Sequence, residues 1–85
     1  MSKIKKLVAR FKTQPSDFKW SELVKMLTFF GFNELQGDGS RVKFINKNKV
    51  IISLHKPHPK KILKKYQIKN ILEVLENERL LEEDL

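Results

Sequence analysis

The sequence predicts an α+β fold of two layers, in which a three-stranded antiparallel sheet carries helices on one face. Apolar residues recur at the spacing of a helix in two segments before Gly31 and in one segment near the C-terminus. Between these segments the spacing changes to about two, as in half-buried strands. A chain of 85 residues has room for only one small core. We therefore expect a single domain over residues 1–85 with the element order α-α-β-β-β-α.

Two amphipathic helices are expected first. In residues 3–12 the apolar side chains follow the i, i+3, i+4, i+7 pattern, the other face is basic, and Ser2 stands at the capping position. Residues 13–17 form a linker around a proline. The second helix repeats the same spacing with five apolar residues: Trp20, Leu23, Val24, Leu27 and Phe30. Gly31 occupies the natural C-cap and ends the helix, and Trp20 is expected in the core.

Three strands are expected next. The first covers residues 32–36 and leads into a turn at residues 37–39, where two glycines flank an aspartate. The second covers residues 41–46. The polar pair Lys47-Asn48 separates it from a third strand over residues 49–54, which is rich in β-branched residues, so these two strands form a hairpin.

The alternation within the second strand assigns its faces. Val42 and Phe44 share one face, while Arg41 and Lys43 lie on the other. Regular strand structure cannot continue through the two prolines at positions 57 and 59, because they lack amide hydrogens. Apolar residues at helical spacing then predict a last helix from about residue 66 to residue 80.

The charge is strongly uneven along the chain. The net charge is +8, but the first 72 residues carry 17 Lys and Arg against four Asp and Glu, whereas residues 73–85 carry one Arg against six acidic residues. A body this basic favours a polyanion such as nucleic acid, since each neutralised phosphate releases counterions. The plainer interpretation is that excess lysine keeps a small protein in solution.

Composition also excludes several classes of protein. The sequence has no cysteine, which excludes disulfides and thiolate metal sites. No apolar run approaches the roughly 20 residues that span a membrane, and the N-terminal residues lack the apolar core of a signal peptide. We therefore expect a cytoplasmic protein without membrane contact.

Residues 37–60 gather the residue types that carry chemistry. A glycine-rich turn leads into Arg41 and Lys43, and the only two histidines, His55 and His58, follow the hairpin. Cationic side chains bind phosphates, and histidine is the residue type that exchanges protons near neutral pH. The pattern indicates phosphate binding with proton transfer nearby. The two histidines have no carboxylate or thiol partner close in sequence, so they make a poor zinc site.

Several of these segments resemble the HicA toxins, small mRNA interferases of bacterial and archaeal toxin–antitoxin pairs. Residues 39–44, GSRVKF, resemble the family's G-S-H-x-x-F motif, and residues 58–72 resemble its H-P-x-K segment and final helix. The helix that ends at Gly31, followed by Phe32, is similar to the family's first helix and its G-[WF] ending. The resemblance covers residues 19–76. It implies a fold like a double-stranded-RNA-binding domain, an mRNA target and a HicB-like antitoxin that covers the site.

One position departs from the family pattern, because Arg41 stands where the family has its catalytic histidine. Metal-free RNA cleavage usually needs one group to take the 2′-hydroxyl proton and another to protonate the leaving oxygen. Arginine stays protonated, so it stabilises phosphate charge but is a poor base. We therefore expect His55 and His58 to act as base and acid beside Arg41, with no cofactor or metal. The expected RNA-binding residues are Ser40, Lys43, Lys56, Lys60 and Lys61.

Each of these residues also has a plainer structural interpretation. His58 can orient its turn through a backbone carbonyl, and His55 can project into solvent or into the sheet. Arg41 and Lys43 can be solvated charges on one strand face, and Ser40 can satisfy the backbone of the turn.

The leading hypothesis is a metal-independent endoribonuclease toxin whose RNA surface combines the hairpin, the loop after it and the basic N-terminal helix. The alternative is a non-catalytic RNA-binding protein of the same fold, and a third hypothesis is an interaction protein whose lysines bind an acidic protein surface. Within the domain we expect a basic helix and linker in residues 1–18, a HicA-like core in residues 19–80 and an acidic tail in residues 81–85. That tail either screens the basic body or is a solvated helix end. An exposed edge strand leaves a homodimer open.

Overall fold

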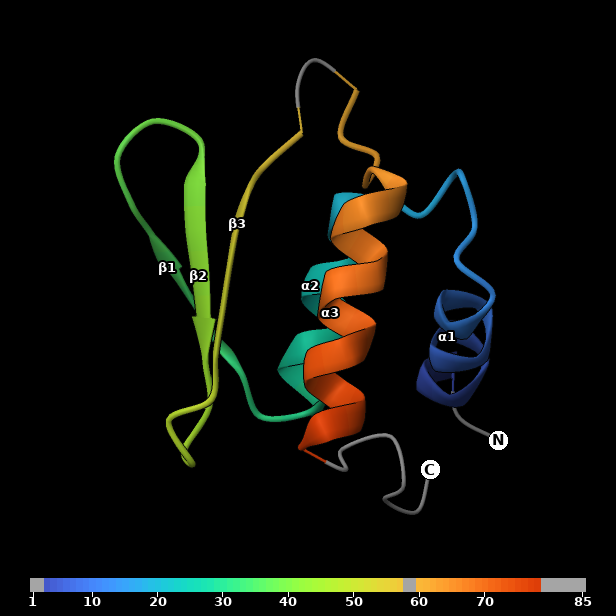
Figure 1. Cartoon of the computed structure of the whole chain (residues 1–85), viewed down its shortest axis with the longest axis horizontal. Coiled ribbons are helices and arrows are strands. Elements are labelled where there is room, and N and C mark those ends of the chain that lie inside the picture. The colour runs from blue at the N-terminus through green and yellow to red at the C-terminus, as the bar shows by residue number, and fades with distance from the viewer. Residues whose placement is uncertain (1–2, 58–59, 79–85) are drawn as a thin grey trace.

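The structure is a computed structural model that describes residues 3–57 and 60–78. Its elements are α1 (Lys3–Lys12), α2 (Trp20–Phe29), β1 (Asn33–Gln36), β2 (Arg41–Ile45), β3 (Ile51–His55) and α3 (Lys65–Asn77). The expected fold class and element order are therefore confirmed (Figure 1). The expected Ser2 cap, the role of His58 and the acidic tail all fall outside the described residues.

The three strands form one antiparallel sheet in the order β1-β2-β3. The helices α2 and α3 form a layer on one face of this sheet, and α1 lies beyond them, against α2 and away from the sheet (Figure 1). No helix of the described part of the chain covers the other face, which we call the outer face. Of these helices, α3 is the longest at 13 residues, and none is long and apolar enough to cross a membrane.

One core lies between the sheet and the helices. The sheet contributes Val42, Phe44 and Ile52, so the expected faces of the second strand are confirmed. Trp20 is buried, its ring centroid lies 5.9 Å from that of Phe44, and it is a core residue as expected. The helices α2 and α3 supply seven further buried side chains: Leu23, Met26, Leu27, Ile68, Ile71, Leu72 and Leu75. Each side chain of this size contributes about 1.5–3 kcal/mol when it is fully buried.

Gly31 ends α2 as the sequence predicts. It follows the C-cap with a φ of 90°, in the left-handed region that glycine adopts without a steric penalty. Its amide donates to the oxygen of Thr28 at 3.0 Å, and the amide of Phe32 donates to the oxygen of Leu27 at 2.9 Å. This pair of bonds is a Schellman motif, and it turns the chain from α2 directly into β1.

The connection between β2 and β3 differs from the expected two-residue gap. The amide of Asn46 donates to the oxygen of Val50 at 3.2 Å, which leaves residues 47–49 as the loop. The buried Asn46 side chain accepts the amide of Val50 at 2.9 Å, and Lys49 takes the left-handed conformation, φ 65°, that this loop type needs. As a result β3 begins at Ile51, later than expected, and His55 is its last residue.

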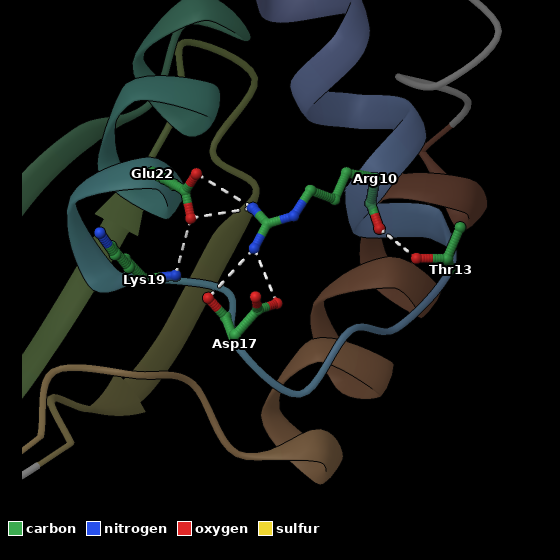
Figure 2. Close-up of polar contacts among 5 residues, drawn as sticks. All are labelled: Arg10, Thr13, Asp17, Lys19 and Glu22. Carbon is green, nitrogen blue, oxygen red and sulfur yellow. Dashed lines mark hydrogen bonds and ion pairs between the residues drawn. The ribbon is translucent and has the colours of Figure 1, made fainter.

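An arginine holds α1 to the rest of the molecule. Arg10 donates from Nη1 to both carboxylate oxygens of Glu22 at 3.0 Å and from Nη2 to Oδ1 of Asp17 at 2.8 Å (Figure 2). These contacts, above all the hydrogen bond to Glu22, raise the pKa of Arg10. Partial burial raises the pKa of Glu22, but hydrogen bonds from the Lys19 amide and from Arg10 outweigh it, so the pKa lies below its ordinary value.

Candidate functional site

The outer face of the sheet carries three of the eight expected site residues, Arg41, Lys43 and His55. Arg41 and Lys43 in β2 and Ser53 and His55 in β3 are all exposed on it, opposite in direction to the buried Val42. The register places Arg41 across from His55 and Lys43 across from Ser53. The fold thus brings together two of the three expected catalytic residues by strand pairing, and not by a loop that folds back.

Arg41 and His55 form a non-hydrogen-bonded pair of the antiparallel ladder. The amide of Lys56 donates to the oxygen of Ser40 at 2.7 Å, which marks that neighbouring pair as hydrogen-bonded. Because hydrogen-bonded pairs alternate along such a ladder, the Arg41–His55 pair is of the other kind, with Cα atoms typically about 4.5 Å apart and side chains close together. A guanidinium and an imidazole therefore share one end of the outer face.

The glycine-rich turn completes this end of the sheet. The amide of Gly37 donates to the oxygen of Arg41 at 2.8 Å, and Gly39 adopts a φ of 61°. The turn and all three strands line a hollow that we call the outer hollow, whose basic residues are Arg41 and Lys43 and whose acidic residue is Asp38. Ser40 is half-buried, and its main-chain oxygen accepts the Lys56 amide at 2.7 Å, which extends the β2–β3 ladder by one pair.

The main chain at His55 is fixed by a residue that the sequence interpretation missed. Gln67 of α3 is buried, and its Nε2 donates to the oxygen of His55 at 2.9 Å. Its Oε1 accepts the amide of Lys64 at 3.0 Å, so one side chain both caps α3 and holds the end of β3. Gln67 stands three residues after Lys64, the N-cap of α3, where a capping box carries Glu or Gln, and this is the available sequence signal.

A cluster of lysines, which we call the lysine cluster, begins at Lys56, directly after His55 at the end of β3. Lys56, Lys60 and Lys61, all expected to bind RNA, line a hollow together with Lys19 at the start of α2. Its floor is Trp20, whose ring centroid lies 5.9 Å from Nζ of Lys56. Lys19 is not among the residues expected from the sequence, because it lies far along the chain from the other three. Two main-chain bonds join these segments, from Trp20 N to Lys61 O at 2.8 Å and from Leu63 N to Phe18 O at 2.8 Å.

Of two further expected features, one falls outside the described residues and the other lies elsewhere in the fold. His58 lies outside the described residues, so the structure does not test its expected role as the acid. The basic helix α1 lies on the far side of the helical layer from the sheet (Figure 1). Because the helices separate α1 from the outer face, α1 shares no face of the sheet with the hairpin, and its expected part in the RNA surface stays a prediction. Within residues 3–57 and 60–78, no group of three or more His, Asp or Glu side chains could hold a metal ion.

Comparison with known proteins identifies the family. Residues 20–76, about two thirds of the chain, match the protein family described as "HicA toxin of bacterial toxin-antitoxin". No curated protein and no solved structure matches the chain significantly. The matched segment begins with α2 and ends within α3, so it contains the whole sheet, the outer hollow and most of the lysine cluster. The chain belongs to the HicA toxin family of bacterial toxin–antitoxin systems.

Proposed function

We propose that this protein is the RNA-cleaving toxin of a type II toxin–antitoxin pair and that it acts at the outer face of its sheet. The observation that carries the proposal is the pairing of Arg41 with His55 across β2 and β3. Arg41 occupies the position of the family histidine in the GSRVKF motif, and the residue directly opposite it supplies an imidazole. A positive charge and a proton-exchanging group thus lie side by side, as phosphoryl transfer requires.

In the proposed reaction a 2′-hydroxyl of the RNA is the nucleophile, and Arg41 and His55 catalyse its attack on the adjacent phosphate. His55 takes the proton of a 2′-hydroxyl, whose oxygen attacks the adjacent phosphorus, while Arg41 stabilises the charge that develops on the phosphate oxygens. The bond from phosphorus to the 5′-oxygen breaks, and that oxygen receives a proton. The products are a 2′,3′-cyclic phosphate and a free 5′-hydroxyl. We assign the proton donor to His58, and no metal takes part.

RNA binding is assigned to residues near this pair. Lys43 lies on the same strand face as Arg41, one alternation further along. The lysine cluster adjoins His55 through Lys56, its neighbour in sequence, and its four lysines line one hollow together with Trp20. A strand of RNA that crosses the outer hollow toward this cluster would meet positive charge along its path.

Incubation of the purified protein with RNA in EDTA, followed by gel electrophoresis, tests the proposal. The wild type should cleave, and His55→Ala and Arg41→Ala should each slow cleavage by about 10²–10⁴-fold. Lys47→Ala is the matched control, because it removes one charge from the loop at the other end of the hairpin. His58→Ala tests the assigned proton donor separately. Full activity of both His55→Ala and His58→Ala would show that the catalytic assignment is wrong.

The alternative function is RNA binding without chemistry. The lysine cluster favours it, since this hollow needs no imidazole to hold phosphates. In that case the protein would shift structured RNA in a salt-dependent manner and leave it intact, and His55→Ala would bind like the wild type. Arrest of growth on overexpression, relieved by His55→Ala, separates the toxin from the binding protein.

The partner we propose is a HicB-like antitoxin that covers the outer face. Membership of a toxin–antitoxin family suggests an antitoxin, and the basic surface around Arg41 favours an acidic contact surface on it. The neighbouring reading frame should encode such a protein. Co-expression should restore growth, and a neighbouring frame that encodes nothing of this kind would count against the toxin assignment.

A further inference from the structure

The strand β3 is an edge of the sheet, because β2 pairs with it on one side only. The Ser40–Lys56 and Asn46–Val50 bonds fix which pairs of the ladder are hydrogen-bonded. By alternation, Ile51 and Ser53 direct their amides and carbonyls away from β2, toward the free edge. The main-chain amides and carbonyls of Ile51 and Ser53 form no hydrogen bond with a described residue outside the sheet. An extended chain can therefore form main-chain hydrogen bonds there without displacing any bond of the described fold.

A groove accompanies this edge. It runs between β3 and α3, and α3 lines it with Tyr66, Gln67, Asn70, Ile71 and Val74. Two large apolar side chains are unusually exposed beside it, Ile51 at 54% and Tyr66 at 60%. Although the chain has 18 lysines and arginines, none of the described residues that line this groove is Lys, Arg, Asp or Glu. Such a surface receives apolar side chains of an added strand without burying an ion.

The opposite edge of the sheet is different. All four residues of β1 are exposed, so the helical layer buries none of them. Its free edge carries Glu34 and Gln36, whose side chains bond to each other at 3.1 Å, and Asp38 follows in the turn. These carboxylates would repel an acidic strand. The edge of β3, by contrast, combines free main-chain groups with a groove whose lining has no Lys, Arg, Asp or Glu.

Charge on the outer face defines what the added strand must carry. Its outward side chains would stand beside Ser53 and His55, and one strand further lie Lys43 and Arg41. Two strand spacings are about 10 Å, a gap that a glutamate and a lysine can close from either side. Ser53 is small, so it leaves the path from the added strand to Lys43 open. The complementary sequence alternates acidic residues, directed to the outer face, with apolar residues, directed into the groove.

We infer that β3 is the docking edge for an extended segment of a partner protein with alternating acidic and apolar residues, which pairs antiparallel to β3 as a fourth strand. A second copy of this chain fits less well, because it would bring another basic body and no acidic residue in its own β3. The acidic side chains would neutralise Arg41 and Lys43. That this neutralisation inhibits the protein rests on the proposed function, whereas the docking itself does not.

Proline substitution tests the docking edge with little effect on the fold. The Ser53 amide faces away from β2, so Ser53→Pro removes a donor needed by an added strand and none that β2 uses. Ser53→Ala controls for loss of the hydroxyl. Gln36→Pro is the matched control on the other edge, since its amide also faces outward. Thermal unfolding of each variant confirms that it is folded.

The probe is a short fluorescent peptide of alternating glutamate and valine, measured by anisotropy. The wild type, Ser53→Ala and Gln36→Pro should bind it alike, and Ser53→Pro should bind at least about tenfold more weakly. A peptide of the same composition with its glutamates in one block should bind poorly. Binding of the peptide by Ser53→Pro as tightly as by the wild type would overturn the inference. A dimer of the free wild-type protein that is lost in the Ser53→Pro variant would also overturn it. RNA cleavage by the same variants is assayed separately, so loss of one activity does not decide the other.

Discussion

The side chain of Gln67 donates a hydrogen bond from Nε2 to the main-chain oxygen of His55 at 2.9 Å. Through this bond α3 fixes the end of β3, where the imidazole lies across from Arg41. Gln67 is 5% exposed, so water cannot readily replace the bond. The position of the proposed base therefore depends on a helix that contributes no group to the outer hollow.

Gln67→Met tests this dependence, because it keeps the length of the side chain and removes both of its hydrogen bonds. The main-chain oxygen of His55 and the amide of Lys64 lose their partner, and we expect a loss of about 1–3 kcal/mol in urea unfolding. Cleavage by the folded variant should also fall, with RNA affinity nearly unchanged. Gln67→Glu keeps the acceptor for Lys64 and should restore part of the stability. Wild-type cleavage by Gln67→Met would show that this bond does not position His55.

The Glu22 carboxylate predicts an acid-sensitive component of stability. Its pKa in the folded protein lies below the ordinary 4.5, because hydrogen bonds from the Lys19 amide and Arg10 outweigh the effect of burial. The unfolded chain therefore binds the proton more tightly than the folded chain does. The contribution is fully present above about pH 4.5 and is lost as the pH falls through the lower folded value.

Urea midpoints measured from pH 7 to pH 3 check this prediction. The wild type should lose stability below pH 4.5 more steeply than Glu22→Gln, whose side chain does not titrate. The difference should be modest, about 1 kcal/mol or less, since Arg10 and Glu22 are both partly exposed. Glu34→Gln removes an exposed carboxylate of β1 and should follow the wild-type curve. Parallel curves for the wild type and Glu22→Gln would contradict the assignment.

Lys49 occupies a position better suited to glycine. Its φ of 65° is in the left-handed region, which costs an ordinary residue about 1–2 kcal/mol. Its side chain is exposed, so little packing is lost on its removal. Lys49→Gly should raise the free energy of unfolding, by up to about 1 kcal/mol once the added freedom of the unfolded chain is included. Lys47→Gly, in the same loop but without a positive φ, should not stabilise the protein.

The salt dependence of RNA binding should separate the two basic surfaces. Each lysine of the lysine cluster that contacts a phosphate adds close to one unit to the slope of log affinity against log salt. Lys56→Ala or Lys61→Ala should lower that slope, whereas Lys12→Ala removes the same charge from α1, behind the helices, and should leave it unchanged. An equal effect of Lys12→Ala would place RNA on α1 as well.

Elements with a clear local signal could be predicted from the sequence. The helical spacing before Gly31 and the alternation around Val42 and Phe44 each specify one structure, and both are confirmed. The sequence predicts the start of β3 too early. The loop has three residues with Lys49 in the left-handed conformation, and no glycine marks that position in the sequence. The position of α1 was not predictable either, since an amphipathic stripe shows that a helix is buried on one side but not which element it packs against.

The site shows the same division. That Arg41 and His55 belong to one hairpin was visible in the sequence, but their pairing depends on the register. With the expected two-residue gap, Leu54 would lie opposite Arg41, because a shift of one residue exchanges the faces of a strand. Lys19 and Gln67 reach the site only through tertiary contacts, which no local pattern reports.

The matched family segment begins at residue 20, yet Val8, Phe11 and Phe18 are at most 1% exposed within the same hydrophobic core. The rings of Phe11 and Phe18 lie 4.8 Å apart, beneath the contacts of Arg10. The segment that matches the family and the segment that folds as one core therefore have different boundaries in this chain. A fragment that begins at residue 20 would expose the apolar surface of α2 that α1 covers. Failure of this fragment to fold or to cleave RNA would therefore say nothing about the chemistry of the intact toxin.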